Sequence, residues 1–232
     1  MIGRLSVGQI KLLAQQVSTA ALDLLFPPCC VNCERVGSFL CSRCLATVTQ
    51  APAREVAGLD GVRVRANFEG AISAAIHAFK YKRQTRLVQP LGGLLCEALQ
   101  GVDWTVDVVS AVPLHAARLR ERGYNQAALL ADHLARERGW ACRPSAIRRV
   151  RETASQVHLN AQERRANVAD AFSADPESVR GQCVLIVDDV LTTGATLSAC
   201  AEAVRAAGAT RVYGATVAGA VYAASPAANA LV

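Results

Sequence analysis

The apolar residues of this chain switch between strand-like and helix-like spacing. Residues 62–68, VRVRANF, alternate apolar and polar side chains, which is typical of a strand with one buried face. The stretches 106–114 and 183–189 are short apolar runs, and such runs predict strands buried on both faces. A further apolar stretch, 211–221, predicts a last strand, followed by a loose tail rich in Ala and Ser.

Helical spacing fills the intervals between these strands. It occurs in the segments 71–84, 87–100, 126–139 and 196–209. The last two segments each have a glycine near their end, as helices commonly do. Strands that alternate with helices predict an α/β fold, in which a parallel sheet carries helices on both faces. In such a sheet the ligand crevice lies at the carboxyl ends of the strands.

The first 26 residues have the pattern of an amphipathic helix. Polar residues interrupt the apolar run at Lys11, Gln15, Gln16 and Asp23, so it predicts neither a membrane span nor a secretory signal. The apolar residues share one helical face and are Ile10, Leu13, Val17, Ala21 and Leu24. We therefore expect a cytoplasmic protein that has no membrane span.

Length and composition favour one globular domain with a small appendage. The chain has 232 residues, of which 52% are hydrophobic and 19% are charged, so extensive disorder is not expected. The tripeptide FPP at 26–28 ends the leading helix, because proline disfavours helix before it. The stretch 49–61 has the composition of a linker. We therefore divide the chain into an N-terminal module, 1–55, and a larger domain, 56–232.

The positive charge is concentrated in one part of the chain. The formal net charge is +6, and residues 115–165, with eleven arginines and five acidic residues, carry that whole excess. A local basic block predicts a local anionic partner. A polyphosphate ligand, a nucleic acid and a solvated arginine-rich helix face all remain compatible with the pattern.

Five of the nine cysteines are close together, in the stretch CCVNCERVGSFLCSRC. It contains two CxxC pairs, Cys30 with Cys33 and Cys41 with Cys44, separated by seven residues. Two such pairs can supply four thiolates to one tetrahedral zinc ion, in a closed site that stabilises a fold and does not catalyse. The stretch therefore predicts a structural zinc-binding module.

Two alternatives to this zinc site stay open. A disulfide pair would fit a secreted protein, but no secretory signal is visible, and a redox pair needs only one CxxC unit. Cys29 competes with Cys30 as a ligand, because both cannot keep the CxxC spacing. We choose Cys30.

The stretch VLIVDDVLTTGATL, 184–197, carries the strongest chemical signal. A buried strand leads into TTGAT at 192–196, where Gly194 permits unusual backbone angles and the threonines add hydroxyl donors. The next helix contributes free N–H groups and the positive end of its dipole. These features predict a cradle for a phosphate group. It is not a Walker loop, because the lysine of that motif is missing.

Two adjacent carboxylates, Asp188 and Asp189, precede this cradle. They repel each other, so the pair requires donors or cations beside it. The vicinal hydroxyls of a ribose are suitable donors. A phosphate cradle together with acceptors for a diol predicts a site for a ribose 5-phosphate.

Several motifs together resemble a known family. VLIVDDVLTTGAT resembles the motif by which type I phosphoribosyltransferases bind phosphoribosyl pyrophosphate (PRPP). The stretches 112–131, VPLHAARLRERGYNQAALLA, and 151–172, RETASQVHLNAQERRANVADAF, resemble the ComF family, as does the cysteine-rich stretch after FPP. The resemblance covers nearly the whole chain and implies a parallel-sheet phosphoribosyltransferase fold that binds PRPP with Mg²⁺.

The resemblance also implies roles for individual residues. Asp188 and Asp189 would hold the ribose hydroxyls and act in catalysis. Pro113, Leu114 and Arg122 would face the pyrophosphate. The segment 151–165 would close over the site, with the candidates Arg151, Gln156 and Arg164. The 5-phosphate would be held by Thr192, Thr193, Gly194, Ala195 and Thr196.

Two functions follow from these expectations. The first is a phosphoribosyltransferase that transfers a phosphoribosyl group to an unidentified acceptor and releases pyrophosphate. The second is a non-catalytic protein that senses PRPP or assists DNA uptake, with single-stranded DNA or a protein of the competence machinery as partner. In that case the cysteine-rich module would touch DNA, although it offers only Arg35, Arg43 and Phe39 for this. One of Lys80 and Lys82 is also expected to reach phosphate.

Overall fold

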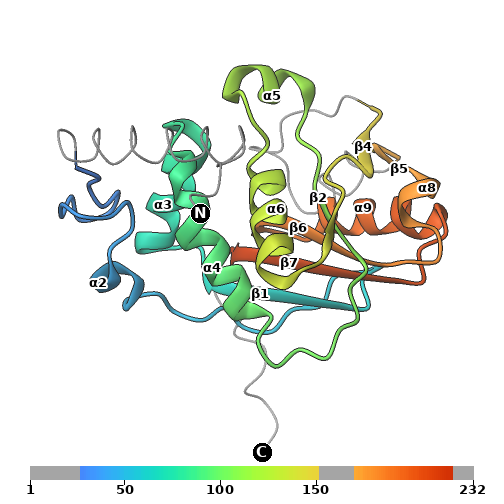
Figure 1. Cartoon of the computed structure of the whole chain (residues 1–232), viewed down its shortest axis with the longest axis horizontal. Helices are drawn as coiled ribbons and strands as arrows, with labels where there is room; N and C mark the ends of the chain where they lie inside the picture. Colours follow the sequence, from blue (N-terminus) through green and yellow to red (C-terminus); the bar gives the residue numbers. More distant parts are fainter. Residues whose placement is uncertain (1–26, 152–169, 222–232) are drawn as a thin grey trace, which may run out of the picture.

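The structure is a computed structural model that describes residues 27–151 and 170–221 (Figure 1). The leading amphipathic segment, two of the three loop candidates and the tail lie outside these residues. No helix among the described residues is long and apolar enough to cross a membrane.

A five-stranded sheet forms the centre of the fold. Its order is β1-β7-β6-β2-β3, and every neighbouring pair is parallel. The strands are β1 (Gly61–Asn67), β2 (Val108–Ala111), β3 (Ala141–Cys142), β6 (Cys183–Leu191) and β7 (Arg211–Gly219). The predicted parallel α/β sheet is confirmed, and all carboxyl ends of its strands lie at one edge.

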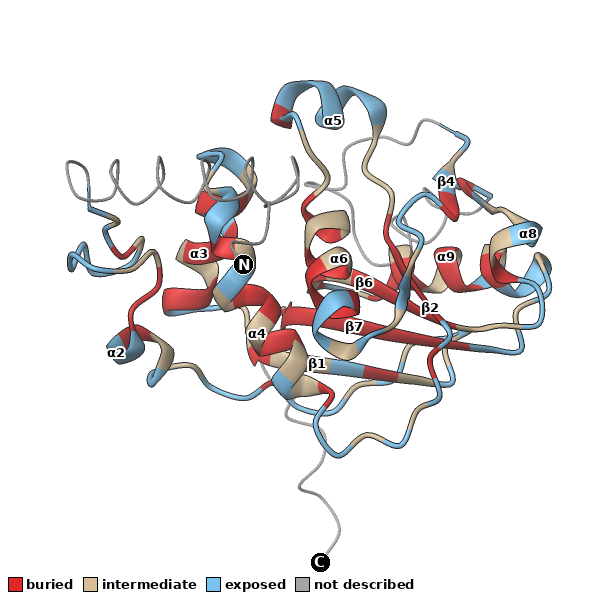
Figure 2. Ribbon diagram, viewed as in Figure 1, coloured by how far each residue is buried: buried red, intermediate tan, exposed pale blue. Residues whose placement is uncertain are grey.

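Helices cover both faces of this sheet (Figures 1 and 2). Side chains alternate between the two faces along each strand, so the apolar side chains of a buried strand pack against helices on both faces. Leu185 and Val187 of β6 pack with α3 (Gly70–Tyr81), α4 (Val88–Ala98) and α6 (Gln126–Arg138). Val184 and Ile186 point the other way and pack with α9 (Ala195–Ala206). The continuous apolar run in β6 is therefore required by burial on both sides.

The remaining elements are short. They are α2 (Ser42–Leu45), η1 (Thr85–Leu87), α5 (Ala116–Arg122), α8 (Pro176–Val179) and an antiparallel pair, β4 (Ile147–Arg149) with β5 (Phe172–Ala174). The β4–β5 pair stands beside α9 and flanks residues 152–169 on both sides.

Some predicted boundaries need correction. The strand expected at 183–189 continues to Leu191, because Val190 and Leu191 still pair with Ala218 and Gly219 of β7. The acidic pair therefore lies inside a strand and not at its end. The last helix ends at Ala206, before Gly208, and β2 is four residues long.

The cysteine-rich module packs onto the larger domain. Leu40, Cys41 and Cys44 belong to the same buried apolar cluster as helices α3, α4 and α6. The stretch predicted to be a linker also contacts the sheet: the Asn67 amide donates to the Thr49 carbonyl at 3.0 Å, and the Thr49 hydroxyl donates to Glu69 at 2.7 Å. The module is thus held by apolar packing and by hydrogen bonds.

Candidate functional site

The turn between β6 and α9 has the backbone of an anion cradle. Gly194 adopts the left-handed conformation (φ +82°) and stands directly before the first residue of α9. A Cβ there would lie 3.0 Å from a methyl carbon of Val56. Glycine is therefore required for two reasons: the backbone has a positive φ, and a side chain would press against Val56. The helix begins without an acidic residue in its first turn. The positive end of the helix dipole therefore faces the turn, and no carboxylate in that first turn offsets it.

Asp188 and the turn share one hollow. Asp188, Thr192, Gly194 and Thr196 line it, together with apolar residues of β6 and α9. The hollow itself has a volume of ≈ 20 Å³, about the space of one water molecule. A larger anion would thus lie at its mouth, against the N-terminus of α9.

The two aspartates point to different faces of the sheet. Asp189 lies on the α3 side, where Nζ of Lys80 is 2.8 Å from its Oδ1. Asp188 lies on the α9 side, in the hollow of the turn, and its Oδ1 accepts the backbone N–H of Asp189 at 2.8 Å. Adjacent residues of a strand alternate in direction, so the pair straddles the sheet. The structure thus brings Asp188 together with the turn and places Asp189 beside a lysine.

Burial and mutual repulsion affect both carboxylates. Burial raises the pKa of Asp188 to about 7, and the neighbouring charge of Asp189 adds to the rise, while Lys80 opposes it. Asp189 is 3% exposed, and among the described residues its Oδ2 has no hydrogen-bond partner. A buried carboxylate oxygen without a donor is costly, so it is suited to a cation or a hydroxyl from a ligand.

The loop after β2 ends at the same edge of the sheet. Pro113 and Leu114 are half-buried there and lead into α5, where His115 Nδ1 accepts the Ala117 amide at 3.2 Å. Because β2 and β6 are neighbours, this loop and the Thr192–Thr196 turn follow adjacent parallel strands. The structure thus places the two predicted loops on adjacent strand ends.

Arg122 lies in a basic cavity beside Asp189. It is 8% exposed, donates to Oε1 of Gln126 and places its guanidinium carbon 5.4 Å from the Tyr81 ring centroid. The cavity has a volume of ≈ 270 Å³. Its lining combines four cations with one acid and one aromatic ring: Lys80, Tyr81, Arg83, Arg118, Glu121 and Arg122. Lys80 therefore connects the carboxylate of Asp189 to a cationic cavity.

The three candidates of the closing loop are not all described. Arg151 is exposed, two residues after β4. Gln156 and Arg164 lie outside the described residues. The only one of the three that the structure places is therefore Arg151, at the start of the segment.

Four cysteines form a cluster with the geometry of a zinc site. The Sγ atoms of Cys30, Cys33, Cys41 and Cys44 all lie within 4.8 Å of one another. Cys30 and Cys44 are 3.7 Å apart, and Cys33 and Cys41 are 3.6 Å apart. A tetrahedron with Zn–S bonds of about 2.3 Å has S–S edges of about 3.8 Å, so four thiolates fit one zinc ion. Cys29 lies outside the cluster, with its thiol 3.6 Å from the Pro27 carbonyl.

The surroundings of the cluster favour a thiolate at Cys30. Burial raises the pKa of that thiol, but hydrogen bonds from the backbone N–H groups of Cys41, Asn32 and Cys33 outweigh it and lower the pKa to about 6. The side-chain amide of Asn32 also donates to the Cys44 sulfur at 3.3 Å. Hydrogen-bond donors that face the sulfur atoms orient and stabilise the thiolates that hold a metal.

The sequence pattern did not single out the cavity at Lys80. Its residues come from the end of α3 and from α5, and the pattern of each segment alone is that of an ordinary basic helix end. The basic run KYKR at 80–83 was the available signal, but it does not tell which lysine turns inward. Packing decides this, since Lys80 is half-buried and Lys82 is exposed.

Comparison with known proteins identifies a matching domain family and several similar proteins. Residues 121–227 match the model of the phosphoribosyl transferase domain. The chain is 35% identical over 136 residues to the DNA utilization protein YhgH of Salmonella typhi, a match that covers 56% of this chain and 60% of that protein. Adenine phosphoribosyltransferase from Thermoanaerobacter pseudethanolicus superposes with a TM-score of 0.38 and 18% identity, over 61% of this chain and 84% of that one.

A longer match comes from Competence protein F of Haemophilus influenzae. It is 30% identical over 191 residues, which cover 78% of this chain and 80% of that protein. By contrast, the chain spans about three fifths of the length of the YhgH proteins. The domain match and the extent of the Competence protein F match lead to one conclusion: this chain belongs to the ComF family and has a type I phosphoribosyltransferase domain.

Proposed function

We propose that this protein binds PRPP with Mg²⁺ and transfers its phosphoribosyl group to an acceptor, with release of pyrophosphate. One observation carries the proposal. A half-buried acid, Asp188, and a glycine-containing turn at the start of a helix line a single hollow at the carboxyl edge of a parallel sheet. An acceptor for hydroxyls next to a donor for phosphate suits a sugar phosphate.

The turn would hold the 5-phosphate. The N–H groups at the start of α9 and the hydroxyls of Thr192, Thr193 and Thr196 are donors, and a phosphate dianion at the mouth of the hollow would accept from them. The Thr193 hydroxyl already accepts the Ala195 amide at 3.4 Å, which fixes the shape of the turn. The ribose would then extend toward Asp188.

The acidic pair fits a hard cation. Carboxylate oxygens are preferred ligands of Mg²⁺. The Oδ2 of Asp189, which has no hydrogen-bond partner within 27–151 and 170–221, is such an oxygen. Mg²⁺, when bound, would neutralise charge on the pyrophosphate. Asp188 and Asp189 would orient the sugar by accepting its hydroxyls. Because they point to opposite faces of the sheet, we assign the hydroxyls nearest the turn to Asp188.

The transfer breaks the bond between the anomeric carbon and the pyrophosphate oxygen, and forms a bond from that carbon to the acceptor atom. The electron pair of the broken bond leaves with pyrophosphate, and the acceptor nucleophile loses a proton. Charge therefore develops on the leaving group, and fixed cations stabilise it. Lys80 and Arg122 of the cavity, with the loop at Pro113 and Leu114, would take this role. Arg151, Gln156 and Arg164 would close over the site.

The cysteine cluster would hold structural zinc. Four thiolates leave no open coordination position, so we assign the metal to the stability of the 1–55 module and not to the reaction in the 56–232 domain. Cysteines that stay reduced and bind a metal, without forming disulfides, are typical of a reducing compartment. This supports a cytoplasmic location.

Thermal unfolding with PRPP and Mg²⁺ tests the site. A ligand that binds only the folded state raises its stability, by about 2.7 kcal/mol at a concentration of 100 Kd. Asp188→Asn and Asp189→Asn should abolish the rise and keep the fold. Asp132→Asn, on the exposed side of α6, is the control and should keep the rise. If both site variants kept the full rise in stability, our assignment of the PRPP site would be wrong. If no nucleobase led to release of pyrophosphate from PRPP, the proposed transferase activity would be wrong.

A second candidate function is binding of single-stranded DNA, and one surface favours it. Tyr81 is 62% exposed, and it lies among the cations that line the basic cavity. An aromatic platform with basic neighbours is the usual means of holding a single strand. The cysteine-rich module is less suited, because Phe39 is half-buried and packs against the core, whereas Tyr81 is exposed.

Binding of an oligonucleotide at several salt concentrations distinguishes the two functions. Tyr81→Ala should weaken binding of the oligonucleotide much more than it weakens stabilisation by PRPP, since pyrophosphate needs no stacking. Arg118→Ala should lower the salt slope by about one. Equal affinities of the wild type and both variants for the oligonucleotide would exclude this surface as the DNA-binding site. Loss of binding when zinc is removed would indicate that the cysteine-rich module binds the oligonucleotide instead.

A further inference from the structure

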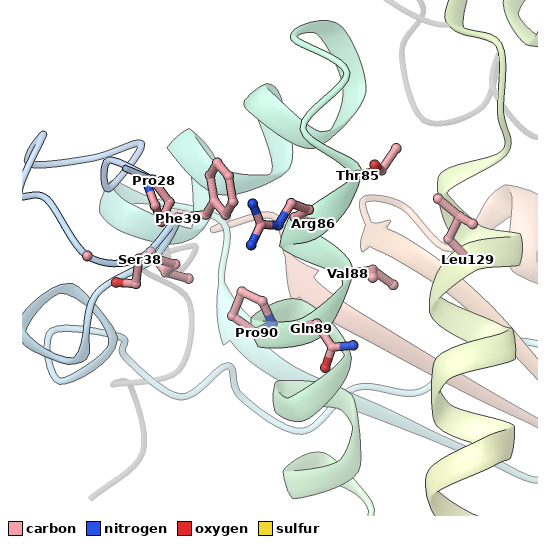
Figure 3. A pocket seen from close by; sticks show the side chains of 11 residues that line it. Pro28, Ser38, Phe39, Thr85, Arg86, Val88, Gln89, Pro90 and Leu129 are labelled. Atoms are coloured by element: carbon pink, nitrogen blue, oxygen red, sulfur yellow. The ribbon is translucent and has the colours of Figure 1, made fainter. Parts of the chain in front are cut away.

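A large cavity lies away from the candidate site, between the cysteine-rich module and the larger domain. Its volume is ≈ 600 Å³. The module contributes Pro28 and the stretch 37–40, and the domain contributes residues 85–90 and Leu129. Figure 3 shows Phe39 and Pro28 on one side, Arg86 and Pro90 in the middle, and Leu129 of α6 on the other. We call this cavity the interdomain groove.

The groove is mainly apolar and has one charged side chain in its described lining. Its apolar lining residues are Pro28, Phe39, Leu40, Val88, Pro90 and Leu129. Its charged residue is Arg86, which packs over Phe39. An apolar groove of this size between two parts of one chain indicates an interaction surface. An amphipathic helix with one acid at the right place would match it.

The segment that precedes Pro27 has these properties. Residues 10–24 predict a helix with one apolar face, which requires a surface on which to bury. Asp23 is the single acidic residue among the first 26, against Arg4 and Lys11. Such a helix would be roughly 21 Å long from residue 10 to residue 24.

Covalent connection favours this segment over any free partner. Phe26 is separated from Pro28, a lining residue of the groove, by one residue. A tethered segment is present at a millimolar effective concentration with so short a connection. Asp23 would thus remain near the groove and opposite in charge to Arg86.

We propose that residues 10–24 dock as an amphipathic helix in the interdomain groove of their own chain. The apolar face would cover Val88, Pro90 and Leu129, and Asp23 would pair with Arg86. Because the groove is lined by both parts of the chain, the docked helix would fasten the cysteine-rich module to the phosphoribosyltransferase domain. This inference does not depend on which ligand the candidate site takes.

Hydrogen exchange of the full-length protein, followed by mass spectrometry, tests the proposal. Val17→Asp places a charge on the apolar face and should accelerate exchange at least tenfold in peptides covering residues 84–91. Gln16→Asp adds the same charge on the polar face and should leave that exchange unchanged. Equal exchange in the wild type and Val17→Asp would overturn the proposal. Protection that disappears on dilution would also overturn it, because it would assign the groove to a second copy.

A charge exchange keeps the test valid if Val17→Asp damages the fold. Asp23→Arg and Arg86→Asp should each accelerate exchange in the groove, since each leaves two like charges together. The double variant should recover most of the protection, because the pair is restored in the opposite sense. Absence of recovery, with both single variants folded, would overturn the proposed contact between Asp23 and Arg86.

Discussion

Lys80 and Asp189 form an ion pair that joins the acidic edge of the sheet to the basic cavity. The lysine Nζ lies 2.8 Å from Oδ1 of the aspartate, and the side chains are 21% and 4% exposed. Lys80 stands near the end of α3, whereas Asp189 lies in the central strand β6. A buried carboxylate requires such a partner, because an uncompensated charge in the interior is strongly unfavourable.

Removal of this lysine charge should destabilise the ligand-free protein. We expect Lys80→Met to lower the free energy of unfolding in urea by about 3 kcal/mol, near the lower limit for breaking a buried pair because Lys80 stays partly exposed. Lys82→Met, at an exposed neighbouring position, is the control and should change little. Addition of Asp189→Asn to Lys80→Met should recover much of the loss. A Lys80→Met variant as stable as the wild type would contradict the role of the pair.

Gly194→Ala should damage both stability and ligand binding. Alanine at φ +82° costs about 1–2 kcal/mol, and its Cβ would also press on Val56 at 3.0 Å. Gly181→Ala is a matched control, because Gly181 has φ +73° and nothing within 4 Å of an added Cβ. Gly194→Ala should therefore lower the unfolding midpoint in urea more than Gly181→Ala does, and only Gly194→Ala should weaken stabilisation by PRPP. Equal midpoints would show that Val56 moves to accommodate the added methyl group with no loss of stability.

Metal analysis should find one zinc ion per chain. Cys33→Ser should lose the metal and lower the melting temperature, because a structural zinc site contributes directly to folding. Cys29→Ser should keep the full metal content, since Cys29 lies outside the cluster. Elemental analysis of the purified variants measures both. Loss of zinc in Cys29→Ser would reverse our choice of Cys30.

Stability of the ligand-free protein should depend on pH through Asp188. Burial raises the pKa of this carboxyl from its ordinary value near 4 to about 7, so the folded state binds a proton that the unfolded state releases. The contribution of Asp188 to stability is therefore complete below pH 4 and is lost as the pH rises to about 7. Asp188→Asn should remove this component, which unfolding of zinc-loaded, magnesium-free protein at pH 5 and pH 8 would measure. An unchanged pH dependence in the variant would assign it to other groups.

The sequence alone determined the architecture and the cysteine cluster. The first part of β6, residues 183–187, is continuous in apolar residues because both of its faces are covered, so a parallel sheet can be predicted from this pattern. The CxxC spacing likewise brings its two sulfurs together within a short turn, so proximity in sequence becomes proximity in space. Gly194 was recognisable because only glycine readily adopts the backbone that the turn requires.

Only the tertiary structure decided which distant side chains meet. Lys80 and Lys82 are equivalent in a sequence pattern, and the packing of α3 on the sheet turns one inward to Asp189 and leaves the other in solvent. The two aspartates are neighbours in sequence, yet strand pleating sends them to opposite faces, and the length of β6 depends on its hydrogen bonds to β7. Local spacing is fixed by covalent geometry, whereas contacts between distant segments depend on the packing of the whole core.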